Sequence, residues 1–344
     1  MKLNLRSIAK ASLVLVYLVI IAGAVVRMTG SGMGCPDWPK CFGYYIPPTQ
    51  ESQLLWEPGR DFKKGQVIIR EERLLTATRD FTTENNFDPN NWEVYTRHDY
   101  AIFNASHTWV EYINRLLGAL AGLATLLMAF WSLGWWKRNK QVTLLSWLTV
   151  FGMGFQAWLG ATVVYSVLAP VRITLHMVMA LIIVAFILRI LHLLKPPGAV
   201  QSYHKPFHYL LWAALALTLI QVILGTQVRQ FIDEQAKLLG DLAKNSWLEH
   251  PKLNFYVHRS FSIAVLAINL YLFYLNRKFR LHFVKIKWVL ILLVLEIASG
   301  MAMYYADFPF GSQPIHLVLA SVLFGIQFYL VLESISAKKQ RKSL

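Results

Sequence analysis

The chain alternates between long apolar runs and short polar segments. Each apolar run is close to the about 20 residues that a helix needs to cross the hydrocarbon core of a bilayer. The pattern predicts eight membrane-spanning helices, at residues 10–28, 107–131, 143–165, 172–194, 208–229, 254–276, 288–306 and 314–334. The first run ends in Arg27-Met-Thr-Gly, without the small-residue cleavage site of a signal peptide, so we interpret it as a span.

The amino-acid composition agrees with this pattern and indicates that the positive net charge reflects orientation in a membrane. Hydrophobic residues make up 56% of the 344 residues and charged residues 15%, against about 25% charged in a soluble domain. The net charge of +15 arises where Lys and Arg collect in the termini and alternate loops, as the positive-inside rule expects of cytoplasmic segments. We therefore expect a multi-pass protein in a lipid bilayer, with both termini cytoplasmic and no nucleic-acid partner. A soluble Rossmann enzyme, a disordered chain and a disulfide scaffold are excluded.

Four motifs occur twice, at corresponding places in the two halves of the chain. They are Gly23–Arg27 and Gly225–Arg229, Tyr112–Arg115 and Tyr256–Arg259, Gln156–Gly160 and Glu296–Gly300, and His176–Ala180 and His316–Ala320. Four spans per unit is an even number, so both units have the same orientation in the membrane.

This repeat predicts an all-α fold of two four-helix bundles, each able to build a site in its core. We place the first bundle in residues 1–200 and the second in 201–344. Residues 29–106, between the first two spans, are expected to form a long, loop-rich periplasmic element in the first unit. The small residues Gly118 and Gly122 suit helix packing within a bundle or between protomers of a homo-oligomer.

Two histidines in the second unit, His258 and His316, are predicted to face each other at one depth. Both lie near the periplasmic ends of their spans, where an ionisable residue is a functional candidate. Two opposed imidazoles leave four equatorial positions open, which suits a haem iron better than a tetrahedral zinc ion. Arg259 is placed to pair with a haem propionate, and Arg27, Arg115 and Arg229 are further candidates for this role.

The first unit lacks one of the two corresponding histidines, because Asn114 occupies the position of His258. His176 is then the remaining ligand candidate, and His107, seven residues before Asn114 on the same helical face, is the second candidate. Glu111 lies between them and is a candidate proton donor or acceptor. For Glu296, the other carboxylate inside a span, we favour a helix–helix hydrogen bond.

Cys35 and Cys41 bracket five residues of the loop after the first span, on the oxidising side of the membrane. A disulfide is compatible with that location, as a structural staple or as a redox-active pair. The preceding Gly30–Gly34 run has no strand before it and no helix after it, so we expect a tight turn and not a phosphate loop.

These residues together resemble the haem A synthase family, the oxidase-assembly proteins of bacterial and mitochondrial inner membranes. The resemblance rests on the run from Arg27 through Thr29–Cys41, on Glu111–Arg115, and on His176, His258-Arg259 and His316. It covers nearly the whole chain apart from most of the long loop.

The resemblance implies a haem b between His258 and His316 and a substrate haem O, received from a haem O synthase, in the first unit. Oxidation of the C8 methyl group of haem O to a formyl group by successive hydroxylations would yield haem A. Glu111 matches the family's carboxylate, and Cys35 and Cys41 match its cysteine pair. An electron donor outside the chain is also required.

The family pattern Glu-x-x-His-Arg reads Glu-x-x-Asn-Arg here, which leaves three alternatives open. His107 takes over ligation with a shifted haem, His176 alone binds the substrate iron, or this half has lost oxidation. The rival functions are a bis-His electron-transfer cytochrome, a haem carrier or transporter, and a non-catalytic assembly scaffold.

Overall fold

The computed structural model describes residues 4–98, 100–196, 201–240 and 242–342. Eight long helices in these residues are apolar enough to span a membrane. They are α1 Leu5–Met28, α2 Ala105–Ser132, α3 Lys140–Tyr165, α4 Pro170–Leu193, α5 Lys205–Leu239, α6 Leu253–Lys278, α7 Ile286–Tyr305 and α8 Ser312–Lys342. The prediction of an all-α, multi-pass membrane protein is confirmed, and each predicted span lies within one helix, with at most one residue outside it.

Two helices extend well beyond their predicted spans. α5 continues for ten residues past residue 229 and ends at Gly240, which has φ of +84°. α8 likewise continues past residue 334 into the basic tail. Hydrophobicity marks only the part of a helix that lies in the hydrocarbon, so polar continuations such as these are invisible to a search for apolar runs.

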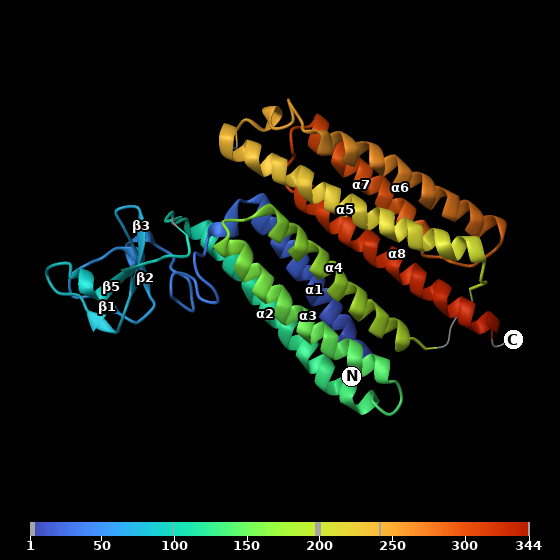
Figure 1. Cartoon of the computed structure of the whole chain (residues 1–344), viewed down its shortest axis with the longest axis horizontal. Coiled ribbons are helices and arrows are strands. Elements are labelled where there is room, and N and C mark those ends of the chain that lie inside the picture. The colour runs from blue at the N-terminus through green and yellow to red at the C-terminus, as the bar shows by residue number, and fades with distance from the viewer. Residues whose placement is uncertain (1–3, 99, 197–200, 241, 343–344) are drawn as a thin grey trace.

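The helices pack as two groups of four, α1–α4 and α5–α8 (Figure 1). The core of the first group includes Ala9, Ala121, Met128 and Ile187, and that of the second includes Leu211, Leu272, Val289 and Leu330. The groups meet mainly through α1, α4, α5 and α8. The domain boundary that we predict after residue 200 falls at residues 197–200, outside the described residues.

An acidic residue bridges two basic residues at each end of the junction between the bundles. At one end, Asp233 pairs with Arg27 of α1 at 2.8 Å and with Arg229 of α5 at 2.7 Å. At the other, Glu333 of α8 pairs with Lys285 at 2.6 Å and lies 3.7 Å from Lys195, which follows α4.

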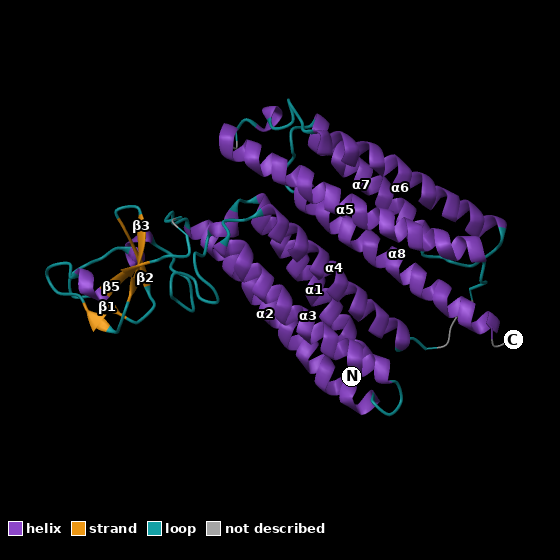
Figure 2. Ribbon diagram, in the orientation of Figure 1, coloured by secondary structure: helices purple, strands orange, loops and turns teal. Residues whose placement is uncertain are grey.

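The long segment between α1 and α2 forms a small β-containing unit, here called the insert (residues 29–104), beyond one end of the helices (Figure 2). Its strands are β1 Asp61–Phe62, β2 Val67–Arg70, β3 Arg73–Ala77, β4 Phe81–Thr82 and β5 Trp92–Val94. β1 pairs with β4, and β2, β3 and β5 form an antiparallel sheet in that order. Two small apolar clusters hold the insert together, one around Phe62 and Trp92 and the other around Cys35 and Phe42.

Candidate active site

The first bundle contains a cavity of about 1730 Å³ at the end nearest the insert. This volume exceeds the roughly 300–1,000 Å³ of ordinary small-molecule pockets, so the cavity suits a large ligand. Its wall combines the insert with residues of α1 to α5 and reaches the second bundle through α8 and the loops after α5 and α7. It brings together the site residues predicted for the first unit, which are Arg27, His107, Glu111, Asn114, Arg115 and His176.

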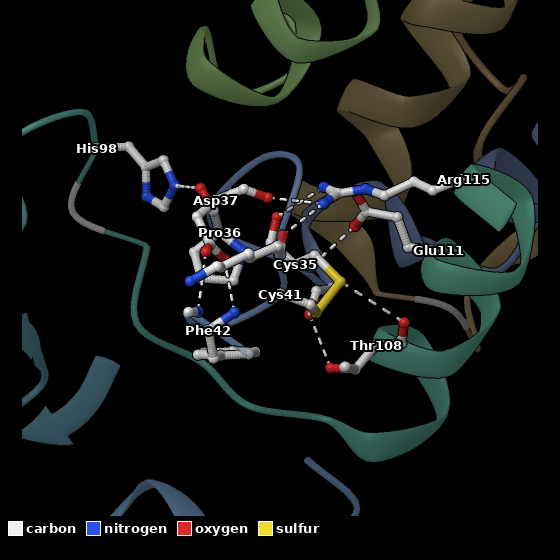
Figure 3. The surroundings of a disulfide bond; sticks show 12 residues. Cys35, Pro36, Asp37, Cys41, Phe42, His98, Thr108, Glu111 and Arg115 are labelled. Carbon is white, nitrogen blue, oxygen red and sulfur yellow. Dashed lines mark hydrogen bonds and ion pairs between the residues drawn. A yellow bond between two sulfur atoms is a disulfide. The ribbon is translucent and has the colours of Figure 1, made fainter. Parts of the chain in front are cut away.

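Glu111 is held in this wall by both of its carboxylate oxygens and is only 4% exposed. Its Oε2 accepts a hydrogen bond from the backbone nitrogen of Cys35 at 2.9 Å, and its Oε1 pairs with Arg115 at 2.5 Å. Arg115 lies one turn further along α2 and also donates to the carbonyl oxygens of Cys35, Asp37 and Lys40. Helix α2 and the loop after α1 are therefore joined by hydrogen bonds from the loop backbone to both members of this ion pair (Figure 3).

The joined loop is closed by a disulfide bond between Cys35 and Cys41. Gly34, just before it, lies directly against the first turn of α2, where a Cβ atom would come 2.4 Å from the carbonyl oxygen of His107. Thr108 completes the contact by donating from Oγ1 to the carbonyl oxygen of Gly34 at 2.7 Å. The predicted tight turn is present, since Gly30 has φ of +68° and Ser31–Met33 form a short 3₁₀ turn.

Asp37 shapes the middle of the disulfide loop. Its carboxylate accepts hydrogen bonds from the backbone nitrogens of Phe42 and Gly43. Burial raises the pKa of the Asp37 carboxyl above its ordinary value, although the hydrogen bonds and the charge of Arg115 act in the opposite direction.

The same loop covers one end of the cavity. Trp38, Pro39 and Tyr45 contribute to the lining, and the hydroxyl of Tyr165 on α3 donates to the carbonyl oxygen of Trp38. On the other side, Tyr95 of the insert donates to the carbonyl oxygen of Pro36 at 2.9 Å. The disulfide loop is thus anchored to α2, to α3 and to the rest of the insert.

His176 and Asn114 both line the cavity. Among the described residues, neither His176 Nδ1 nor Asn114 Oδ1 has a hydrogen-bond partner, although both atoms are buried. His176 packs against Gly160, whose Cβ position would lie 3.3 Å from Cε1, and Asn114 lies next to Gly23. Because Nδ1 of His176 is buried, Nε2 is the ring nitrogen available to a ligand in the cavity.

The second bundle places His258 and His316 opposite each other, with ring centroids 6.4 Å apart. Two metal–imidazole bonds of about 2.0 Å each, together with the two half-rings, span roughly 6 Å. His258 lies against Gly225 and His316 against Gly300, at contacts matching those of Asn114 with Gly23 and of His176 with Gly160.

The residues around this pair fit a haem better than a bare metal ion. In the described part of the chain, no group of three His, Cys, Asp or Glu side chains is arranged to hold a metal ion. A porphyrin supplies the four equatorial ligands that the chain would otherwise lack. Glu296 forms the expected helix–helix hydrogen bond, since its Oε2 lies 2.8 Å from His316 Nδ1.

The arginines predicted to hold propionates have different surroundings. Arg27 and Arg229 line the cavity but share Asp233, and Arg115 is engaged with the disulfide loop. Arg259 is exposed and lies over the rings of Phe255 and Tyr256. Their role in binding propionates stays a prediction.

Sequence reasoning missed three contributors to these sites, Asp37, Asp233 and Ser299. Asp233 follows Arg229 by four residues, the spacing of a helical ion pair, so continuation of α5 would have indicated it. Asp37 and Ser299 act through contacts with distant residues or with the backbone, for which the sequence carries no comparable signal.

The chain belongs to the cytochrome oxidase assembly protein family (COX15-CtaA), which matches residues 6–72 and 93–328. The unmatched residues 73–92 lie in the insert, from the start of β3 to the start of β5. The predicted membership is confirmed.

Curated relatives agree with this assignment. A heme A synthase of Flavobacterium johnsoniae is 24% identical over 92% of this chain and 93% of its own length, and one of Bacillus licheniformis is 25% identical over 95% of both. A heme A synthase of Rhodospirillum centenum is 31% identical over 68% of this chain and 55% of its own length.

Proposed function

We propose that this protein is a haem A synthase, a membrane oxidoreductase that converts the C8 methyl group of haem O to a formyl group by successive hydroxylations, giving haem A for cytochrome oxidase. Family membership and the names of the relatives support a role in haem A biosynthesis. The observation that carries the proposal is that Glu111 and His176 line the same large cavity.

In this proposal the two bundles have different tasks. The second, residues 201–344, holds a haem b between His258 and His316, which supplies one-electron transfer when bound. The first, residues 1–200, binds haem O as substrate, with His176 as the iron ligand. His107 lines the same cavity and is the candidate for the opposite face of the substrate haem, in place of the missing imidazole at Asn114.

Glu111 is proposed as the catalytic residue that accepts or returns a proton during oxidation. Its carboxylate is held in the wall of the cavity by hydrogen bonds from Cys35 and Arg115. The disulfide loop, through Trp38 and Pro39, limits access of water to the cavity from the insert end.

Binding of the acidic haem substituents is assigned to four arginines. Arg27, Arg115 and Arg229 line the cavity of the first bundle, and Arg259 follows a proposed haem b ligand. Guanidinium groups form paired hydrogen bonds with carboxylates such as propionates.

We further propose that the protein resides in the bacterial inner membrane with both termini in the cytoplasm and the insert in the periplasm. There it would receive haem O from a haem O synthase and electrons from an external donor. A homo-oligomer stays a prediction, because Gly118 and Gly122, the small residues suggested for helix packing, line the cavity.

Two experiments test these assignments. Pigment extracted from cells that supply haem O should contain haem A, whereas an electron-transfer cytochrome or a carrier would return haem O unchanged. His258→Ala should remove the bis-His absorption spectrum from purified protein; an unchanged spectrum would place the haem b elsewhere.

A further inference from the structure

We propose that Glu296 and Ser299 are positioning residues for His316, which fix its tautomer and make it the more strongly electron-donating ligand of the second-bundle haem. Their effect is to lower the reduction potential of that haem. The inference rests on the haem b site proposed above and extends it from the two ligands to the groups behind one of them.

The hydrogen bonds around His316 determine which ring nitrogen carries the proton. Nδ1 lies 2.8 Å from Oε2 of Glu296 and 2.8 Å from Oγ of Ser299. The Ser299 hydroxyl donates its own proton to the backbone carbonyl oxygen of Glu296 at 3.0 Å. Its oxygen therefore faces Nδ1 as an acceptor, as does the carboxylate, so Nδ1 must be the donor.

A proton on Nδ1 leaves Nε2 with a free lone pair, the form that an imidazole needs to bind iron. A carboxylate that accepts the Nδ1 proton of a metal-bound histidine also orients the ring and raises its basicity. Glu296 is only partly exposed, with 12% of its side chain accessible, so water screens this interaction weakly. The added electron density favours ferric over ferrous iron.

His176, at the corresponding position of the first bundle, lacks this arrangement. Gln156 stands at the position of Glu296 and donates from Nε2 to the backbone carbonyl oxygen of His176 at 3.0 Å. Leu159 stands at the position of Ser299. Within the described residues, Nδ1 of His176 consequently has no partner.

The two bundles thus present one histidine backed by a carboxylate and one without a carboxylate. His258, the other proposed haem b ligand, has no carboxylate behind its ring in the described part of the chain. Gln221 donates to its backbone carbonyl oxygen, and its Nδ1 has no partner among the described residues. Of the groups behind the two ligands, Glu296 is therefore the one expected to have the largest effect on the reduction potential of the haem.

The test is a redox titration of purified holoprotein, followed by absorbance, comparing wild type with Glu296→Gln. The variant introduces the residue of the first bundle and removes the charge while keeping the side-chain volume. At a fixed potential we expect the ratio of ferrous to ferric haem to rise about tenfold, which corresponds to about 59 mV for a one-electron couple. Glu333→Gln is the matched control, because it removes a buried carboxylate from the same bundle at the far end of α8, and it should leave the ratio unchanged.

An unchanged ratio in Glu296→Gln, with the bis-His spectrum intact, would overturn this inference and leave the haem b site standing. A wild-type protein that lacks the bis-His spectrum would instead overturn the site itself. If Glu296→Gln fails to hold haem, Ser299→Ala decides the question: a smaller shift in the same direction supports the inference, and no shift contradicts it.

Discussion

Glu111 and Cys35 are joined by a hydrogen bond of 2.9 Å between the Glu111 carboxylate and the Cys35 backbone nitrogen, across 76 positions of the chain. The bond connects the proposed catalytic carboxylate to the disulfide loop that covers the cavity. A displacement of the disulfide loop is therefore expected to displace the Glu111 carboxylate as well.

Replacing Glu111 with Ala should abolish haem A formation while haem b stays bound in the second bundle. Glu111→Gln should have the same effect with less disturbance, since an amide oxygen can still accept from Cys35 but the charge and the proton-accepting group are gone. Loss of a general acid–base group typically costs about 10²–10⁴ in rate. The measurement is haem A per haem b in extracted pigment. Wild-type amounts of haem A in either variant would remove Glu111 from the catalytic role.

Gly34→Ala should displace the disulfide loop from α2, because the added Cβ would lie 2.4 Å from the carbonyl oxygen of His107. Overpacking of this kind costs about 1–3 kcal/mol, and the displaced loop should also weaken the hydrogen bond to Glu111. We expect a lower thermal unfolding temperature in detergent and reduced haem A formation.

Gly134→Ala is the matched control for this loop variant, since no atom lies within 4 Å of its Cβ position. Equal unfolding temperatures for the two variants would show that close approach at Gly34 is unimportant.

Asn114→His should allow a second bis-His haem. Asn114 lies beside Gly23 as His258 lies beside Gly225, so the backbone leaves space for an imidazole opposite His176. Because His107 is the proposed ligand opposite His176, the comparison is made in a His107→Ala background. When haem occupies the first bundle there, Asn114→His should show about twice the low-spin bis-His absorption of Asn114→Ala, measured per mole of protein. Equal spectra for the two variants would mean that His176 and residue 114 do not face one haem.

The stability of the disulfide loop should depend on pH through Asp37. A carboxyl whose pKa is raised by folding stabilises the fold below its ordinary pKa of about 4. That stabilisation is lost as the pH rises through the higher pKa of the folded state. Asp37→Asn does not titrate, so the stability advantage of wild type over this variant should shrink as pH increases from about 4. Thermal unfolding across pH 4–8 measures it, and an advantage that grows with pH would show that the ionised carboxylate is the favoured form.

The eight helices could be predicted from the sequence because each buries a continuous apolar surface in lipid, and hydrophobicity reports this directly. The meeting of Glu111, Asn114 and His176 in one cavity was also predictable in outline, since the repeat relates them to residues of the second half. The insert was recognisable only as a polar, loop-rich segment, because its strands have two to five residues.

Contacts between segments distant in the sequence could not be predicted. Nothing around Cys35 indicates that its backbone nitrogen meets Glu111, and nothing near Ser299 indicates that its hydroxyl faces His316. The pairing of Asp233 with Arg229 could be inferred only if helix α5 were known to continue past residue 229. Such contacts depend on packing of whole elements, which local patterns do not encode.

The identity of the pigment produced by the wild-type protein tests the central claim most directly. The chain should be expressed in a host without its own haem A synthase, together with a source of haem O, and the extracted haems separated and identified by mass. Glu111→Gln, expressed to the same level, serves as the inactive comparison. We predict haem A from wild type and only haem O and haem b from the variant. Haem O and haem b alone from wild type, with the bis-His spectrum present, would contradict the account and leave a haem-binding protein without oxidase activity.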